Sequence, residues 1–534
     1  ALDRAERDHG LGADVVVLVG ERLLECGEGR LAADLAHGPD RAAAGLDVLA
    51  TEDLGERWKC GRADLCEGCR GLPAEILVVL LERGGQGAGC GGVAPDEESK
   101  TVTIAGEQFS EGDVISLDGA SGEVFKGAID LVEPKMTGAF STLMQWAEEY
   151  REMGVWTNAD TPKDARQALE YGAEGIGLCR TEHMFFEEDR IANVRQMMLT
   201  APDVRRLERQ IENAEMAKTQ ASGAQLGRIE QEIAGIEAEL ADVRELFDGA
   251  LEQLLPEQRA DFEGIFEVMD GLPVVIRLLD PPLHEFLPHE PDLQQRLAEQ
   301  MGTSADKIAD SVNELRELNP MLGHRGCRLG ITYPDIYNMQ VRAIMEAAVA
   351  CKERGVDVHP EIMIPLVGTQ EELRICREAA DKVCQNVLAK AGLEIEYKIG
   401  TMIEVPRAAL TADQIAEYAD FFSFGTNDLT QMAFGFSRDD VGVFVPEYVD
   451  REILETDPFQ VLDQAGVGQL VAMGVEKGRS AKPDLKVGIC GEHGGEPRSV
   501  KFCHRVGLNY VSCSPFRVPI ARLAAAQAAL EARG

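Results

Sequence analysis

The stretch FFSFGTND, residues 421–428, joins an apolar run to a polar end. Its first residues are mostly apolar on both faces, as in a parallel strand that helices cover on either side. Glycine, threonine, asparagine and aspartate follow where the chain must leave the strand. The pattern therefore predicts a β-strand whose carboxyl end carries polar side chains.

Seven further segments repeat this pattern, and helical stretches separate them. They are GVWTNAD (154–160), GIGLCRTE (175–182), PVVIRLLD (273–280), EIMIPLV (361–367), KIGTMIEV (398–405), KVGICGE (486–492) and LNYVSCSP (508–515). Eight β-then-α repeats over this length predict an α/β fold, a (β/α)8 TIM barrel. We expect its functional side chains at the carboxyl ends of the strands, because that mouth carries the active site in such barrels.

One segment, 203–248, departs from the alternation. Apolar residues recur there at three- and four-residue steps and the opposite face is charged, which predicts an amphipathic helix. The stripe comprises Leu226, Ile229, Ile233, Ile236, Leu240, Val243 and Leu246. Because ASGA at 221–224 is suited to a turn, we interpret the segment as a helical hairpin inserted between the second and third strands. We expect it to be a solvated arm or a dimer contact.

The amino-terminal part divides into two regions. Residues 1–94 are rich in Gly, Ala, Arg, Leu and Glu and lack sustained periodicity, so we leave them unassigned, as disordered or mistranslated sequence. Residues 95–133 contain short alternating runs separated by glycines, which favour a small β-rich domain. We assign 134–534 to the barrel domain.

Composition limits the possible partners. The chain has 534 residues and a formal net charge of −40, so it lacks the basic surface that binds nucleic acid or anionic membrane. No apolar run reaches the length of a membrane-spanning helix, and we recognise no signal peptide. Thirteen scattered cysteines are typical of reduced thiols, which favours a cytoplasmic protein.

Polar residues gather at the predicted strand ends. They are Arg180, Arg277, Asp280, Glu404, Asn427, Asp428 and Cys490. Each has a structural alternative: the arginines and Glu404 could form salt bridges, Asn427 and Asp428 could cap a helix, and the cysteine could be an ordinary buried residue. The coincidence of cations, carboxylates, an amide and a thiol at one rim favours a functional site.

This set of side chains suits one kind of chemistry. Two arginines can hold a phosphoryl group, and Glu404 with Asp428 can bind Mg2+ through hard oxygen ligands. Such cations neutralise the charge that develops during phosphoryl transfer. The thiol of Cys490 can move a proton to or from carbon. Phosphoryl transfer beside protonation of carbon predicts the interconversion of pyruvate and phosphoenolpyruvate (PEP).

Five motifs carry a resemblance to a known family. They are GLCRTEHMFF (177–186), NPMLGHRGCRLG (319–330), GTMIEVPRAAL (400–410), FFSFGTNDLTQMAFGFSRDD (421–440) and GICGEHGGEP (488–497). From about residue 100 to the end, apart from the hairpin, the chain resembles the pyruvate, phosphate dikinases of the PEP-utilising superfamily. The resemblance implies the conversion of ATP, phosphate and pyruvate to AMP, diphosphate and PEP. It also implies Mg2+ as cofactor and a homodimer.

The resemblance further implies a role for each matching residue. Arg180 and Arg277 match the substrate arginines, and Glu404 and Asp428 match the Mg2+ ligands and also face the substrate. Cys490 matches the acid that protonates the methylene carbon of enolpyruvate. The remaining matches are substrate-facing residues, namely Gly425, Thr426, Asn427, Arg325 and Arg438. For Arg325 and Arg438 a salt-bridge role stays open.

The residues next to Cys490 in the sequence also allow a prediction. Gly488 and Gly491 flank it, and we expect their bare backbone to let substrate and thiol approach one another. We expect Glu492 and His493, which come next, to orient other groups rather than to react.

The chain also departs from the family. The run that carries the phosphorylated histidine of the swivelling domain is expected just before residue 95 and is not recognisable, so we interpret 95–133 as a remnant of that domain. No ATP-grasp region is recognisable either, so ATP and phosphate are partners only if those regions are present. Two alternatives therefore stay open: a PEP synthase, and a non-catalytic remnant that binds pyruvate or PEP.

Overall fold

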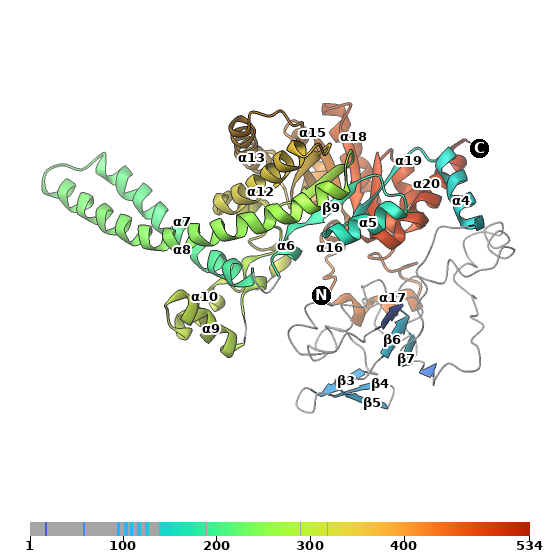
Figure 1. Cartoon of the computed structure of the whole chain (residues 1–534), viewed down its shortest axis with the longest axis horizontal. Helices are drawn as coiled ribbons and strands as arrows, with labels where there is room; N and C mark the ends of the chain where they lie inside the picture. Colours follow the sequence, from blue (N-terminus) through green and yellow to red (C-terminus); the bar gives the residue numbers. More distant parts are fainter. Residues whose placement is uncertain are drawn as a thin grey trace. The chain divides into compact units, whose positions relative to one another are not determined.

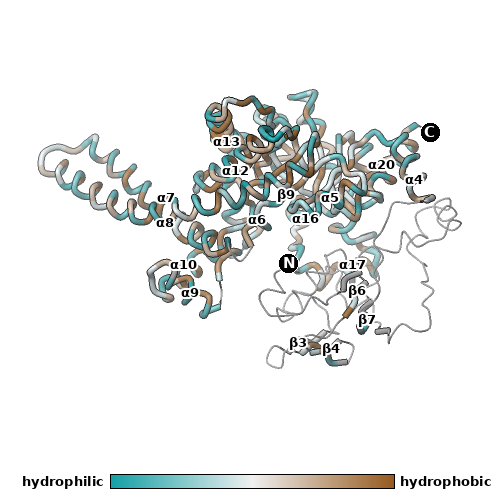
Figure 2. Tube along the Cα trace, in the orientation of Figure 1, coloured by the Kyte–Doolittle hydropathy of each residue, from teal (hydrophilic) through white to brown (hydrophobic). Residues whose placement is uncertain are grey.

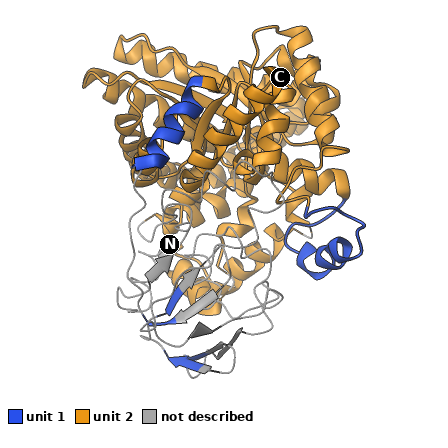
Figure 3. Ribbon diagram, turned by 90° about the vertical axis from the view of Figure 1, so that its right-hand side faces the viewer, with its two compact units in different colours: residues 1–149, 435–457 blue, residues 150–434, 458–534 orange. Residues whose placement is uncertain are grey.

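The computed structural model describes residues 138–533, except 187–189, 289 and 318, together with short segments before them. These segments are 16–18, 57–58, 93–96, 101–104, 107–110, 115–118 and 123–127. The chain forms two compact units, 1–149 with 435–457 and 150–434 with 458–534 (Figure 3). The larger unit begins at residue 150 and excludes the segment 435–457, and the domain bounds predicted from the sequence stay a prediction.

The smaller unit contains two sheets. One has the strand order β1-β6-β7-β2 and the other is the antiparallel sheet β3-β4-β5. The strands are β1 Val16–Leu18, β2 Arg57–Trp58, β3 Val93–Asp96, β4 Thr101–Ile104, β5 Glu107–Ser110, β6 Ile115–Asp118 and β7 Glu123–Lys126. Its helices are α4 Gly138–Tyr150, η6 Val441–Val443 and α17 Val445–Asp450. Most of 1–94 lies outside the described residues, and the remnant-domain prediction for 95–133 stays a prediction.

The larger unit is built on a closed barrel of eight parallel strands, in the order β10-β11-β12-β13-β14-β15-β8-β9. The strands are β8 Gly154–Asn158, β9 Ile176–Arg180, β10 Pro273–Arg277, β11 His359–Ile364, β12 Lys398–Ile403, β13 Phe421–Gly425, β14 Lys486–Cys490 and β15 Tyr510–Cys513. Each coincides with one of the eight predicted runs, so the predicted α/β barrel is confirmed. The runs were recognisable because strands covered by helices are apolar on both faces.

Helices surround the barrel and connect its strands (Figure 1). The longer ones are α5 Pro162–Glu170, α9 Pro291–Met301, α10 Ala305–Leu315, α12 Pro334–Glu353, α13 Gln370–Ala391, α16 Thr426–Phe434, α18 Val467–Ala481, α19 Pro497–Arg505 and α20 Val518–Arg533. Short helical turns include α6 Thr181–Met184, α11 Cys327–Thr332, α14 Pro406–Leu410, α15 Ala412–Ala416, η4 Leu283–Phe286, η5 Pro320–Leu322, η7 Glu492–Gly495 and η8 Pro515–Arg517. Helix α13 shows why helices start where they do: Thr369 and Glu372 form a reciprocal capping box there. Within the described part of the chain, no helix is both long and apolar enough to span a membrane.

An ion cluster around the buried Glu361 lies at the amino end of the barrel. Glu361 on β11 contacts the Nζ atoms of Lys486 and, at 3.2 Å, Lys398. The ammonium of Lys486 also lies 4.8 Å from the ring centroid of Trp156, which stacks on Tyr510. Burial lowers the pKa of Lys486, although Glu361 opposes that shift. These charges and rings belong to the packing of the amino end, opposite the mouth where the strands carry the predicted site residues.

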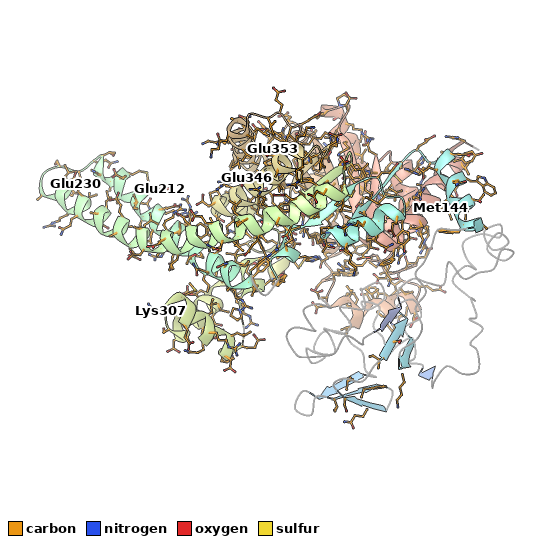
Figure 4. The ribbon with its side chains drawn as sticks, in the orientation of Figure 1. Met144, Glu212, Glu230, Lys307, Glu346 and Glu353 are labelled. Atoms are coloured by element: carbon orange, nitrogen blue, oxygen red, sulfur yellow. The ribbon has the colours of Figure 1, made fainter. Side chains whose placement is uncertain are left out.

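Two long helices, α7 Ile191–Lys218 and α8 Ala224–Val268, form an arm that extends away from the barrel (Figure 1). Hydrophilic residues recur along both helices (Figure 2), and Glu212 and Glu230 lie on the arm in Figure 4. The paired helices extend beyond the predicted 203–248 on both sides, because their bases continue into the helical layer of the barrel. There they pack through buried residues such as Val194 and Phe262.

A pair of glycine substitutions tests the packing of the barrel. A Cβ added at Gly488 would lie 2.1 Å from the ring of Tyr510, so Gly488→Ala should overpack the barrel and cost about 1–3 kcal/mol. Gly235 on the arm has open space around it, so Gly235→Ala should stabilise α8 by about 0.5–1 kcal/mol. Free energies of unfolding from chemical denaturation measure both effects. A Gly488→Ala protein as stable as the parent would contradict this packing.

Candidate active site

The register of the barrel brings three predicted residues together at the carboxyl mouth. Ile403 pairs with Phe424 and Gly425 pairs with Cys490, so Glu404, Gly425 and Cys490 end three adjacent strands. A Cβ added at Gly425 would lie 2.4 Å from Oε2 of Glu404. The carboxylate therefore lies over the bare backbone of Gly425, next to the strand that carries the thiol.

Two arginines lie on another adjacent pair of strands, β9 and β10. Arg180 and Arg277 are register partners at the ends of β9 and β10. Nη1 of Arg277 lies 2.8 Å from Oδ2 of Asp280, and Nη2 contacts Glu182. Burial alone would lower the pKa of Arg277, but the charges of Asp280 and Glu182 outweigh it and hold the pKa well above its usual value. This guanidinium is therefore a fixed cation at the mouth.

Arg325 joins two carboxylates. Its Nη2 donates to Oδ2 of Asp280 at 2.6 Å and to Oδ2 of Asp428 at 3.1 Å. Burial by itself would raise the pKa of Asp280, yet Arg277 and Arg325 lower it overall. The other oxygen of Asp428 accepts a hydrogen bond from Gln431 at 3.0 Å. The salt-bridge role that the sequence left open for Arg325 is thus present, and it orients Asp428.

A strained backbone position holds Glu404. Oε1 of Glu404 accepts the N–H of Leu366 at 2.6 Å, and Leu366 has a φ of 60°, a conformation that few non-glycine residues adopt. A Cβ on Gly326 would lie 2.6 Å from that of Leu366, so glycine is required beside this turn. Such strain persists only where its surroundings enforce it, which is common at functional sites.

Glu404 and Asp428 form an acidic pair that fits a divalent cation. Burial, followed by the charges of Asp428 and Asp280, raises the pKa of Glu404 well above its usual value. Among the described residues no group of three or more His, Cys, Asp or Glu side chains is placed to hold a metal ion. Mg2+ nevertheless needs only one or two carboxylates, since substrate oxygens and water complete its shell. A cation between these two carboxylates would remove their repulsion.

Cys490 lies at the floor of the mouth, with 2% of its surface exposed. The hydroxyl of Ser423 donates to its sulfur at 3.3 Å, and its thiol points to the carbonyl of Phe424 at 3.8 Å. Burial raises the pKa of Cys490, and Ser423, Arg277 and Arg180 oppose that shift only in part. The residue is therefore a protonated thiol at neutral pH, which suits a proton donor.

Asn427, at the start of α16, supplies the side-chain amide of the site. Oδ1 of Asn427 is buried and has no hydrogen-bond partner within the described part of the chain. An amide can be flipped, so this group can present either a donor or an acceptor to a ligand. His493 bonds the hydroxyl of Thr426 at 2.7 Å and the carbonyl of Pro458 at 3.0 Å. It thereby fixes the first residue of the helix, as expected of an orienting residue.

The two glycines near Cys490 serve different purposes. Gly491 has a φ of 120°, and a Cβ there would face Oδ1 of Asn427 at 3.6 Å. It therefore leaves open backbone beside the unsatisfied amide. The expectation for Gly488 is wrong, because the ring of Tyr510 fills the space that its missing side chain leaves. Sequence alone does not tell packing from ligand access.

The mouth brings together all but one of the predicted site residues. They are Arg180, Arg277, Arg325, Glu404, Gly425, Thr426, Asn427, Asp428 and Cys490. Arg438 lies in 435–457, which belongs to the smaller unit, and its role stays a prediction. Sequence reasoning missed the contacts of Glu182, Ser423, Leu366 and Gln431. Ser423 had a signal, as the hydroxyl in an otherwise apolar strand, whereas Leu366 had none.

Comparison with known proteins places this mouth in context. The family model described as PEP-utilising enzyme, PEP-binding domain, matches residues 134–530. The pyruvate, phosphate dikinase of Clostridium symbiosum is 52% identical over 444 residues, covering 83% of this chain and 46% of the relative. The chloroplastic pyruvate, phosphate dikinase 1 of Oryza sativa subsp. japonica is 48% identical over 515 residues, covering 92% and 50%.

The chloroplastic pyruvate, phosphate dikinase of Flaveria pringlei is 53% identical over 513 residues, covering 91% of this chain and 49% of the relative. This chain therefore spans about half the length of the curated relatives it matches.

Proposed function

Since this chain belongs to the family of PEP-utilising enzymes, we propose that it carries the pyruvate half-site of a pyruvate, phosphate dikinase. The observation that supports the proposal is the meeting of Arg180, Arg277, Glu404, Asp428 and Cys490 at one mouth. The half-reaction is phosphoryl exchange between a phosphohistidine and the enolate of pyruvate. With the remaining regions of such a protein, it would serve the conversion of ATP, phosphate and pyruvate to AMP, diphosphate and PEP.

The direction from PEP shows what each side chain does. Arg180 and Arg277 bind the phosphoryl group and offset the negative charge on its oxygens as the P–O bond breaks, with its electron pair left on the enolate oxygen, and a P–N bond forms on the carrier. The oxygen that loses phosphorus becomes the enolate oxygen. The enolate closes to a ketone as its methylene carbon takes the proton from the thiol of Cys490. Asn427 positions the carboxylate.

Glu404 and Asp428 would hold Mg2+ in this proposal. The ion, when bound, supplies positive charge to the oxygens of the substrate. Arg325 donates to one oxygen of Asp428 at 3.1 Å, so it orients a carboxylate that would hold the ion. The homodimer and the cytoplasmic location implied by the resemblance complete the proposal.

Removal of the metal tests this half-site directly. We expect a chelator to weaken PEP binding to the unaltered chain by about tenfold or more, because the anionic ligand would lose the positive charge that the ion supplies to its oxygens. Isothermal titration calorimetry with and without Mg2+ measures the effect. Glu404→Gln should bind PEP with little dependence on Mg2+, while Glu346→Gln on the outer helix α12 (Figure 4) should behave like the parent. PEP binding that is equally tight with and without the chelator would contradict the assignment of Glu404 and Asp428 as Mg2+ ligands.

A further inference from the structure

A carboxylate and a histidine form a pair at the rim beside Arg180. Oδ1 of Asp160 accepts the backbone N–H of Arg180 at 2.6 Å, and Oδ2 bonds Nδ1 of His183 at 2.7 Å. The same Oδ2 lies 3.8 Å from Nη1 of Arg180. One carboxylate therefore fixes both an arginine of the mouth and an imidazole three residues further on.

The short helix α6 turns these residues in different directions. Glu182 is buried and contacts Arg277, whereas the side chain of His183 is 53% exposed. Because Asp160 occupies Nδ1, Nε2 is the ring nitrogen of His183 that remains for a ligand, and it has no partner in the part of the chain that the structure describes. The fold therefore orients the imidazole ring through Nδ1 and leaves Nε2 available to a ligand.

The surroundings of Asp160 lower the pKa of its carboxyl group. Burial alone would raise the pKa of Asp160, but the hydrogen bond from His183 and the charge of Arg180 lower it overall. The carboxylate is therefore ionised at neutral pH, and it accepts a hydrogen bond from Nδ1 of His183 at 2.7 Å. A protonated ring offers a charge-assisted Nε2–H donor to an anion.

The mouth needs such a donor. Nη1 and Nη2 of Arg277 already serve Asp280 and Glu182, so part of its hydrogen-bonding capacity is spent inside the protein. The substrate's reacting carbon must face Cys490 at the floor, and its phosphoryl group must face the rim, where a carrier can reach it. The side chain of His183, which follows the end of β9, is 53% exposed on that rim.

We propose that His183 is a further phosphoryl-binding residue, whose Nε2–H, oriented by Asp160, donates to a non-bridging oxygen of the phosphoryl group beside Arg180. This inference rests on the proposed function. It distinguishes the two ligands of the site, since PEP carries a phosphoryl group and pyruvate does not. Removing the imidazole should therefore weaken one ligand only.

Calorimetry of the full chain with Mg2+ and each ligand tests the inference. In His183→Asn we expect the Kd for PEP to rise about tenfold to hundredfold, as for loss of a hydrogen bond to a charged group, and the Kd for pyruvate to stay unchanged. His359→Asn is the matched control. His359 is 41% exposed and bonds Asp357 at 3.1 Å, but it begins β11 at the opposite end of the barrel.

A second measurement needs no variant. The ring nitrogen resonances of His183 in the unaltered chain should shift on addition of PEP with Mg2+ and should not shift on addition of pyruvate with Mg2+. Unchanged PEP binding in His183→Asn, equal weakening of both ligands, or equal shifts with both would overturn the inference and leave the proposed function standing. If the unaltered chain binds no PEP, the proposed function fails and the inference fails with it.

Discussion

Replacing Cys490 by alanine is expected to slow proton exchange at the methyl group of pyruvate by about 100- to 10,000-fold, the usual contribution of a positioned general acid or base. The thiol is buried at the floor of the mouth and lies against Ser423, so no other thiol occupies its place. PEP binding should survive, because Arg277 and the carboxylates are untouched. Deuterium wash-in at the methyl group, followed by NMR or mass spectrometry with Mg2+ present, measures the loss.

Cys513→Ala provides the matched control for this experiment. Cys513 is equally buried and ends the next strand, β15, but its sulfur contacts the carbonyl of Trp156 instead of Ser423. The Cys513→Ala variant should therefore catalyse proton exchange at the methyl group of pyruvate as fast as the parent. Exchange that persists in Cys490→Ala would remove the thiol from its assigned role. Absence of exchange in the unaltered chain would favour the reading of a PEP-binding remnant without catalysis.

Replacing Arg277 by methionine is expected to lower stability by about 3–5 kcal/mol, because it leaves buried carboxylates without their cation. Glu182 and Asp280 both contact this guanidinium and both are buried. PEP affinity should fall with it, since a phosphoryl-binding group is lost. Urea denaturation and calorimetry with PEP measure the two effects separately.

Two further variants separate charge from geometry. Arg277→Lys keeps the positive charge but loses the planar fork that reaches both carboxylates, so its stability should lie between those of the parent and the methionine variant. Arg342→Met removes an arginine that is 52% exposed and pairs with Glu346 on the same helix, which should cost less than about 1 kcal/mol. Equal losses of stability in Arg277→Met and Arg342→Met would contradict the prediction that the buried ion pairs of Arg277 contribute more than an exposed one.

The sequence was sufficient for the barrel and for most of the candidate site. All eight strands were visible as apolar runs, because helices cover them on both sides. Residues such as Glu404, Asp428 and Cys490 were visible because polar groups at the ends of such runs must share one mouth. The motifs added roles that spacing alone does not give.

Other contacts depend on chain segments that are far apart in sequence. Arg325 reaches Asp280 from 45 residues away and Asp428 from 103 residues away, so its role as an orienting cation was open until the fold was known. The strained Leu366 and the ring of Tyr510 above Gly488 left no local trace at all. The pairing of Asp160 with His183 depends on how two neighbouring strands end.

What the residues determined by themselves was periodicity: where strands and helices run, and which polar groups end them. What the tertiary structure alone decided was the partner of each charge and the direction of each side chain. The physical reason is that burial and hydrophobic pattern are properties of a local segment, whereas ion pairs, backbone strain and packing over a glycine arise only when distant segments meet.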